Sequence, residues 1–151
     1  MSEVIINCEC GHASVSLNVI PRVRFRCHCT KCQSVYGAPY ADAMFLRRGQ
    51  AKLLDNDTIE WVNTKQPSPL VRGICRKCKD PILAHFFGIT SIVPTKAVTT
   101  HNVPKVTCDI YYETRVADID DNLPKYNSTF MSYVGLSLPI LGVLALSKGW
   151  N

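Results

Sequence analysis

Seven of the eight cysteines stand in three short groups, at spacings that are typical of metal ligands. The groups are Cys8-Glu-Cys10, Cys27-His-Cys29-Thr-Lys-Cys32 and Cys75-Arg-Lys-Cys78. In a strand, side chains two positions apart project from the same face, so both sulfurs of Cys-x-Cys can reach one ion. Cys-x-x-Cys achieves the same across a tight turn. Four thiolates close a tetrahedral zinc site, whereas three leave one position for a substrate atom.

The seven clustered cysteines divide as four plus three. The first and third pairs are each too few for a stable site, but together they complete one thiolate set: Cys8, Cys10, Cys75 and Cys78. Such a closure contributes directly to folding, because the site does not exist in the unfolded chain. Cys27, Cys29 and Cys32 then form a second site with a free fourth position, where zinc could lower the pKa of an incoming thiol. We therefore expect two zinc ions per chain, one structural and one catalytic.

Another partition of the same residues stays open. Two Cys-x-x-Cys knuckles, Cys29/Cys32 and Cys75/Cys78, would make a plain zinc ribbon with one ion, but this leaves three clustered cysteines unused. His28 is an alternative ligand, although on an extended backbone its ring points away from the metal of its two neighbours. Cys108 stands alone on an alternating segment and is expected to be a small buried hydrophobe.

Composition indicates one ordinary globular domain. The chain has 151 residues, 46% of them hydrophobic and 19% charged, with a net charge of +5. No long basic stripe accompanies that charge, which argues against nucleic acid as a partner. The first residues show no basic and no long apolar region of a signal peptide. We therefore expect a reducing, cytoplasmic location, where paired cysteines are metal ligands and not disulfides.

The elements that would carry these cysteines are mostly short strands separated by Gly and Pro turns. One or two helical turns are expected at Thr30–Tyr36, and the Arg47-Arg48-Gly49 sequence is expected to be a turn. The fold class is therefore mainly β. The predicted strands are Glu3–Asn7, His12–Val19, Val23–Cys29, Tyr40–Leu46, Ala51–Leu54, Thr58–Val62, Leu70–Ile74, Ile82–Phe87, Ser91–Val93 and Val106–Glu113.

The C-terminal segment, residues 127–151, differs from the rest of the chain. No charged residue occurs from Tyr126 to Ser147, and Phe130–Leu146 is mostly apolar on all sides. Gly135, Pro139 and Gly142 weaken a continuous helix. We expect the segment to pack on the domain or on a second copy in a homodimer, and membrane contact is the alternative.

Taken in order, the cysteine motifs resemble those of the glutathione-dependent formaldehyde-activating enzymes, a family that includes centromere protein V. The resemblance spans residues 8 to 126. It rests on Cys8-Glu-Cys10-Gly11, on Cys27-His28-Cys29-Thr30-Lys31-Cys32 leading to Gly37-Ala38-Pro39, on Arg72-Gly-Ile-Cys75-Arg-Lys-Cys78, on Asp109-Ile-Tyr-Tyr and on Asp121-Asn-Leu-Pro124-Lys-Tyr126.

The resemblance implies a β-tent-like domain, residues 3–126, with two zinc ions. It implies the same ligand division: a structural zinc on Cys8, Cys10, Cys75 and Cys78, and a catalytic zinc on Cys27, Cys29 and Cys32. The implied activity is carbon–sulfur lyase chemistry, the reversible joining of glutathione and formaldehyde to S-hydroxymethylglutathione. Basic residues near the site could position the carboxylates of glutathione, and sequence proximity points to Arg26, Lys31 and Arg72.

Three residues depart from the family pattern without removing a zinc ligand. Ile74 and Lys79 replace the Phe and Gly that commonly flank the third cysteine motif, and Asp109 replaces a histidine. The leading hypothesis is a two-zinc lyase acting on a thiol–aldehyde adduct. The competing hypothesis is a non-catalytic, zinc-stabilised module that carries glutathione or binds protein or nucleic acid.

Overall fold

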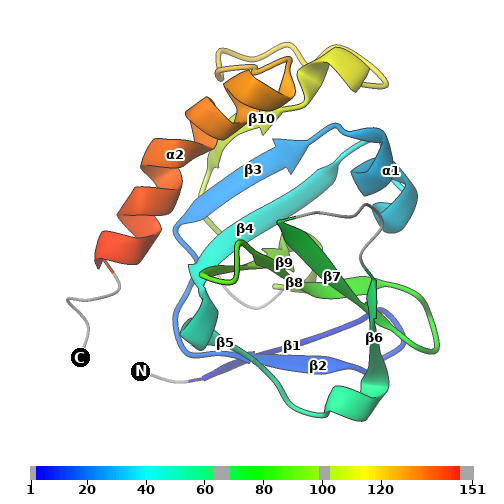
Figure 1. Cartoon of the computed structure of the whole chain (residues 1–151). Helices are drawn as coiled ribbons and strands as arrows, with labels where there is room; N and C mark the ends of the chain where they lie inside the picture. The colour runs from blue at the N-terminus through cyan, green and yellow to red at the C-terminus, as the bar shows by residue number, and fades with distance from the viewer. Residues whose placement is uncertain (1–2, 63–68, 99–102, 147–151) are drawn as a thin grey trace.

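The computed structural model of the protein describes residues 3–62, 69–98 and 103–146 and is mainly β, as the sequence predicts (Figure 1). A small antiparallel sheet has the order β1-β2-β5, and a larger sheet has the order β10-β3-β4-β9-β8-β7-β6. In the larger sheet β10 pairs with β3 in parallel, and the other neighbours are antiparallel. The strands are β1 (Val4–Asn7), β2 (Ser14–Leu17), β3 (Val23–Cys27), β4 (Ala41–Arg47), β5 (Ala51–Leu53), β6 (Ile59–Val62), β7 (Leu70–Cys75), β8 (Pro81–Phe86), β9 (Thr90–Pro94) and β10 (Val106–Ile110).

Strand β4 separates two hydrophobic cores. Because successive side chains of a strand point to opposite faces, Met44 and Leu46 enter one core, while Ala43 and Phe45 enter the other. The first core fills the space against the small sheet and includes Cys8 and Cys75. The second includes Phe25, Cys27, Cys32 and Leu136. The two cysteine sets therefore lie in different cores, on opposite faces of β4.

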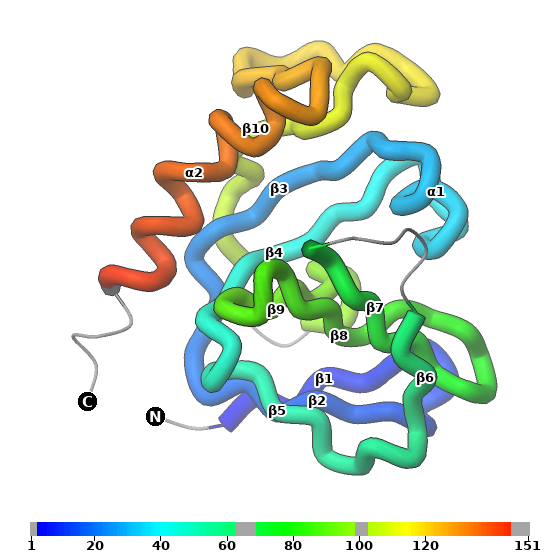
Figure 2. Tube along the Cα trace, viewed as in Figure 1, coloured from blue at the N-terminus to red at the C-terminus, as the bar shows by residue number. Residues whose placement is uncertain are grey.

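In the described part of the chain, two α-helices accompany the sheets. Helix α1 (Thr30–Tyr36) matches the predicted helical turns and ends at Gly37, whose φ of 59° suits glycine. Helix α2 (Thr129–Leu146) lies along the side of the large sheet formed by β3, β4 and β10 (Figure 2). Among the described residues, no helix is long and apolar enough to cross a membrane.

Helix α2 is continuous despite Gly135, Pro139 and Gly142. Tertiary contacts outweigh the weak intrinsic propensity. Leu136 is buried in the second core, and the buried Ser132 hydroxyl accepts a 2.9 Å hydrogen bond from the backbone N–H of Tyr111. Phe130, Leu138 and Leu141 are exposed on the helix. Whether a second copy or a membrane contacts them stays a prediction, as does the division of the chain at residue 126.

The last strand is shorter than predicted. The sequence predicts Val106–Glu113, but β10 ends at Ile110 because Tyr111 adopts a left-handed backbone with φ of 52°. A short 3₁₀ turn, Tyr112–Thr114, follows. Arg48–Gln50 is likewise a 3₁₀ helix at the turn expected between β4 and β5. The chain then returns alongside β10, where Asp109 and Lys125 form an isolated parallel bridge, and reaches the start of α2 (Figure 1).

Replacing Gly135 with alanine is expected to destabilise the protein by about 1–3 kcal/mol through overpacking. A Cβ at Gly135 would lie 2.3 Å from the Tyr126 ring, which packs against this turn of α2. Gly142→Ala is the matched control, because a Cβ there meets nothing within 4 Å. It should stabilise the same helix by up to about 1 kcal/mol. Urea unfolding measures both, and equal effects of the two substitutions would contradict the packing explanation.

Candidate functional site

The first cysteine set joins the two sheets. Cys8 and Cys10 follow β1, Cys75 ends β7, and Cys78 lies in the turn before β8. The four sulfurs lie within 4.8 Å of one another. The Sγ of Cys10 is 3.6 Å from the Sγ of Cys8 and 3.6 Å from that of Cys75. Four sulfurs at the usual Zn–S length are about 3.8 Å apart in a tetrahedron, so this set fits a tetrahedral metal ion.

Backbone geometry supports this arrangement. Gly11 and Lys79, which follow the two pairs, both have a positive φ, at 79° and 64°. These turns let backbone N–H groups face the sulfurs. The N–H of Ala13 donates to Cys8 Sγ at 3.3 Å, and the N–H of Lys77 donates to Cys75 Sγ at 3.4 Å. Such hydrogen bonds help to fix the positions of the two sulfurs.

The second cysteine set lies where β3 passes into α1. Cys27 ends the strand, Cys29 caps the helix, and Cys32 is in its first turn. The three sulfurs lie within 4.8 Å of one another, and the N–H of Cys32 donates to Cys29 Sγ at 3.3 Å. Among the described residues, the groupings that could hold a metal are this trio and the set of four. The ribbon partition, with Cys29 and Cys32 joined to Cys75 and Cys78, does not occur among them.

A buried arginine faces the second set. Arg72 on β7 is 7% exposed, and its Nη2 donates to Cys32 Sγ at 3.4 Å. Hydrogen bonds from the Cys27 and Cys32 thiols, the N–H of Cys32 and the charge of Arg72 together hold the pKa of Cys29 far below that of free cysteine. The hydrogen bond to Cys29 correspondingly raises the pKa of Cys27. Within the trio, these contacts therefore favour the thiolate form at Cys29 over Cys27.

A cavity of about 460 Å³ opens beside the three-sulfur group, and Cys27, Cys29 and Cys32 form part of its wall. Of the three basic residues selected by sequence proximity, Lys31 and Arg72 also line it. Arg26 does not, because it binds Asp109 and Asp121 elsewhere. The aromatic wall is not predicted above from the sequence, although Phe25 is two residues before Cys27 in β3 and therefore shares its face.

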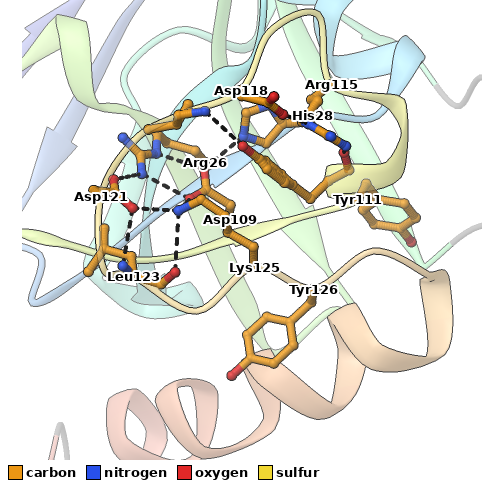
Figure 3. A network of polar contacts seen from close by, with 12 residues as sticks. Arg26, His28, Asp109, Tyr111, Arg115, Asp118, Asp121, Leu123, Lys125 and Tyr126 are labelled. Carbon is orange, nitrogen blue, oxygen red and sulfur yellow. Dashed lines mark hydrogen bonds and ion pairs between the residues drawn. The ribbon is translucent and has the colours of Figure 1, made fainter.

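His28 belongs to a polar network on the other side of β3 (Figure 3). Its Nε2 is 2.7 Å from Asp109 Oδ1, and both side chains are almost completely buried. Arg26 donates to both carboxylate oxygens of Asp109, at 2.8 and 2.9 Å. Lys125 and Asp121 complete the network. His28 therefore faces a carboxylate and not the sulfurs, and it is outside the three-sulfur group.

The sequence and fold were compared with those of known proteins. The family model described as glutathione-dependent formaldehyde-activating enzyme matches residues 3–114. The crystal structure of a Rhodobacter sphaeroides protein superposes with a TM-score of 0.56 and 16% identity, covering 67% of this chain and 98% of that one. At this identity the superposition shows a shared fold. A search of curated proteins gave no match.

Proposed function

The chain belongs to the glutathione-dependent formaldehyde-activating enzyme family, and we propose that it is a zinc-dependent carbon–sulfur lyase acting on a thiol–aldehyde adduct. The observation that carries the proposal is the three-sulfur group in the wall of a cavity. A group with only three protein ligands leaves a position for a reactant, and the cavity provides room for one.

Two zinc ions per chain are proposed, in different roles. Cys8, Cys10, Cys75 and Cys78 would hold a structural ion, and Cys27, Cys29 and Cys32 a catalytic one. When bound at the three-sulfur group, zinc would supply a Lewis acid that lowers the pKa of a thiol. The fit rests on sulfur type, sulfur count and mutual distance.

The residues around the trio supply a positive charge and an apolar cavity wall. Arg72 places a fixed positive charge beside Cys32 Sγ, which favours anionic sulfur on this side of the cavity.

In the forward reaction the thiol sulfur forms a bond to the carbonyl carbon of the aldehyde. The electron pair of the C=O bond moves to oxygen, and the thiol proton ends on that oxygen. The reverse reaction breaks the C–S bond, and neither direction needs an oxidant.

Replacing Cys29 with serine tests the proposal. Turnover of formaldehyde with a thiol should fall to the uncatalysed rate, and the zinc content should fall from two ions to one. The melting temperature should stay within about 5 °C of the wild type, because the set of four is untouched. Zinc analysis, a coupled adduct assay and circular dichroism measure these quantities.

Cys108→Ala is the matched control, since Cys108 is buried but belongs to neither cysteine set. It should retain both ions and full turnover. If Cys29→Ser retains turnover after losing an ion, the lyase proposal fails. If it unfolds, the second ion is structural, as the competing binding-module hypothesis requires.

A further inference from the structure

The cavity beside the three-sulfur group is lined mainly by hydrocarbon. Of the 24 lining residues, 13 have purely hydrocarbon side chains, and only Lys31 and Arg72 carry a charge. Among the described residues, none of those that line the cavity is acidic. Apolar walls bind the apolar part of a ligand by removing its surface from water. The composition of the wall therefore indicates which kind of group a thiol ligand carries on its sulfur.

One part of this wall is aromatic. Phe25 and Phe45 are stacked with ring centroids 4.5 Å apart, and Phe86 continues the row at 6.2 Å from Phe45. All three line the cavity, and Phe25 and Phe45 are almost completely buried. Aromatic rings prefer partners that are offset or edge-on at such distances. A flat hydrocarbon group on the ligand would find suitable contacts here.

The charged groups are few, and the buried one is already engaged. Arg72 donates to Cys32 Sγ, which leaves Lys31, at the partly exposed start of α1, as the other cation of the wall. Glutathione carries two carboxylates, an ammonium group and two amides. Burying these groups without partners is costly. The wall offers the hydroxyls of three threonines and three tyrosines for the amides, but one cation already engaged with sulfur, one partly exposed lysine and no acidic side chain for the three charged groups.

Helix α2 forms one side of this cavity through Thr129, Tyr133 and Leu136, which share a helix face. Tyr133 contacts the aromatic row at Phe86, with ring centroids 6.1 Å apart. The family match ends at residue 114, so this side of the cavity lies outside the matched region. The features that suit an apolar ligand thus include a part of the chain that the family description does not cover.

We infer that the cavity takes a thiol whose sulfur is attached to a compact apolar group, aryl or branched alkyl, in preference to a charged peptide thiol. The inference rests on the proposed function for the identification of a thiol as the reactant. The apolar group would lie against the aromatic row and α2, with the sulfur directed toward Cys27, Cys29 and Cys32.

Calorimetric titration of the zinc-loaded protein tests the preference directly. Phenylmethanethiol should bind about 10- to 100-fold more tightly than glutathione, which corresponds to removing one aromatic group from water. Toluene, which has no sulfur, should compete with phenylmethanethiol. Equal or tighter binding of glutathione would overturn the inference, and so would a lack of competition by toluene.

Two lysine substitutions on helix α2 test whether phenylmethanethiol binds in this cavity. Tyr133→Lys places a cation at the cavity wall and should weaken phenylmethanethiol binding about tenfold. Leu138→Lys is the matched control, because Leu138 is 78% exposed and does not line the cavity. It should leave the affinity unchanged. Equal losses in both variants would contradict binding in this cavity.

Turnover with formaldehyde separates this inference from the proposed function. If phenylmethanethiol binds more tightly but neither thiol forms an adduct, the lyase proposal fails and the ligand preference stands. If glutathione reacts with the higher kcat/KM, the lyase proposal stands and the ligand preference fails.

Discussion

Replacing Cys75 with serine is expected to abolish cooperative folding, the largest effect of any single substitution proposed for this chain. Cys75 is fully buried, and its sulfur is 3.6 Å from that of Cys10, in the turn that follows β1 of the other sheet. A structural zinc ion contributes about 10–16 kcal/mol of binding free energy, which is comparable to or larger than the total stability of a typical domain. Losing one of four ligands removes a large part of that free energy.

The remaining polar contacts beside the set of four are too weak to compensate. Asp80 accepts a 3.0 Å hydrogen bond from the N–H of Glu9 and pairs with the half-exposed Lys96. A typical hydrogen bond adds about 1 kcal/mol and an exposed ion pair about 1 kcal/mol or less. Without the ion, the first core is therefore the main remaining link between the small and the large sheet, and the turn that carries Cys8 and Cys10 is expected to separate from the β7–β8 hairpin.

Thermal circular dichroism and zinc analysis measure the outcome. Cys75→Ser should show no sharp unfolding transition and should retain less than one zinc ion per chain. A strong chelator should unfold the wild type in the same way. Cys29→Ser provides the comparison, since it should lose one ion but melt cooperatively. A Cys75→Ser protein that melts like the wild type would show that the set of four does not stabilise the fold.

The cysteine arrangement could be anticipated from the sequence because its signals are local. Two sulfurs of Cys-x-Cys or Cys-x-x-Cys are brought together by the backbone between them, whatever the rest of the fold does. The contact between Cys10 and Cys75 is long-range. It could still be predicted, because a tetrahedral zinc site needs four ligands and each of the two cysteine pairs supplies only two. The mainly β class follows from short alternating segments in a similar way.

The remaining features depend on contacts that local patterns do not encode. The left-handed backbone of Tyr111 ends β10 early, and no glycine marks this position. Helix α2 forms through Gly135 and Pro139 because Ser132 and Leu136 pack onto the sheet. The cavity is assembled from β3, β4, β7, β8, β9, β10, α1 and α2, so its apolar character becomes visible only in three dimensions.

Asp109 is the clearest example of a role that the sequence does not reveal. It appears in the motif comparison only as a departure from the family pattern. Asp109 and Arg26 are 83 residues apart in the sequence but lie on neighbouring strands of the structure. Their side chains form a bidentate ion pair. Asp109 also contacts His28, which stands between Cys27 and Cys29. The buried carboxylate therefore positions the segment that carries the three-sulfur group.

Replacing Asp109 with asparagine is expected to cost about 3–5 kcal/mol, because it leaves the largely buried Arg26 without its main counter-ion. Asparagine has nearly the same shape as aspartate, so the loss in the free energy of unfolding comes from the missing charge and not from a change in side-chain volume. Asp121→Asn is the matched control, since Asp121 pairs with the same Arg26 but is more exposed, and its cost should be clearly smaller. Urea unfolding at neutral pH measures both, and equal losses would contradict the central role of Asp109.

The effect of Asp109→Asn should also depend on pH. Burial raises the pKa of Asp109, but the hydrogen bonds from Arg26 and His28 outweigh it and lower the pKa below the ordinary value of 3.8. A carboxyl group with a lowered folded-state pKa contributes its full stability above the unfolded-state pKa and loses it as the pH falls through the folded-state pKa. The difference between the wild type and Asp109→Asn should thus be constant above about pH 5 and shrink in more acidic solution. Since acid also protonates cysteine ligands in both proteins, the pH series compares the two at equal zinc content. A difference that grows toward low pH would show that Asp109 is protonated in the folded protein and that the network is not an ion pair.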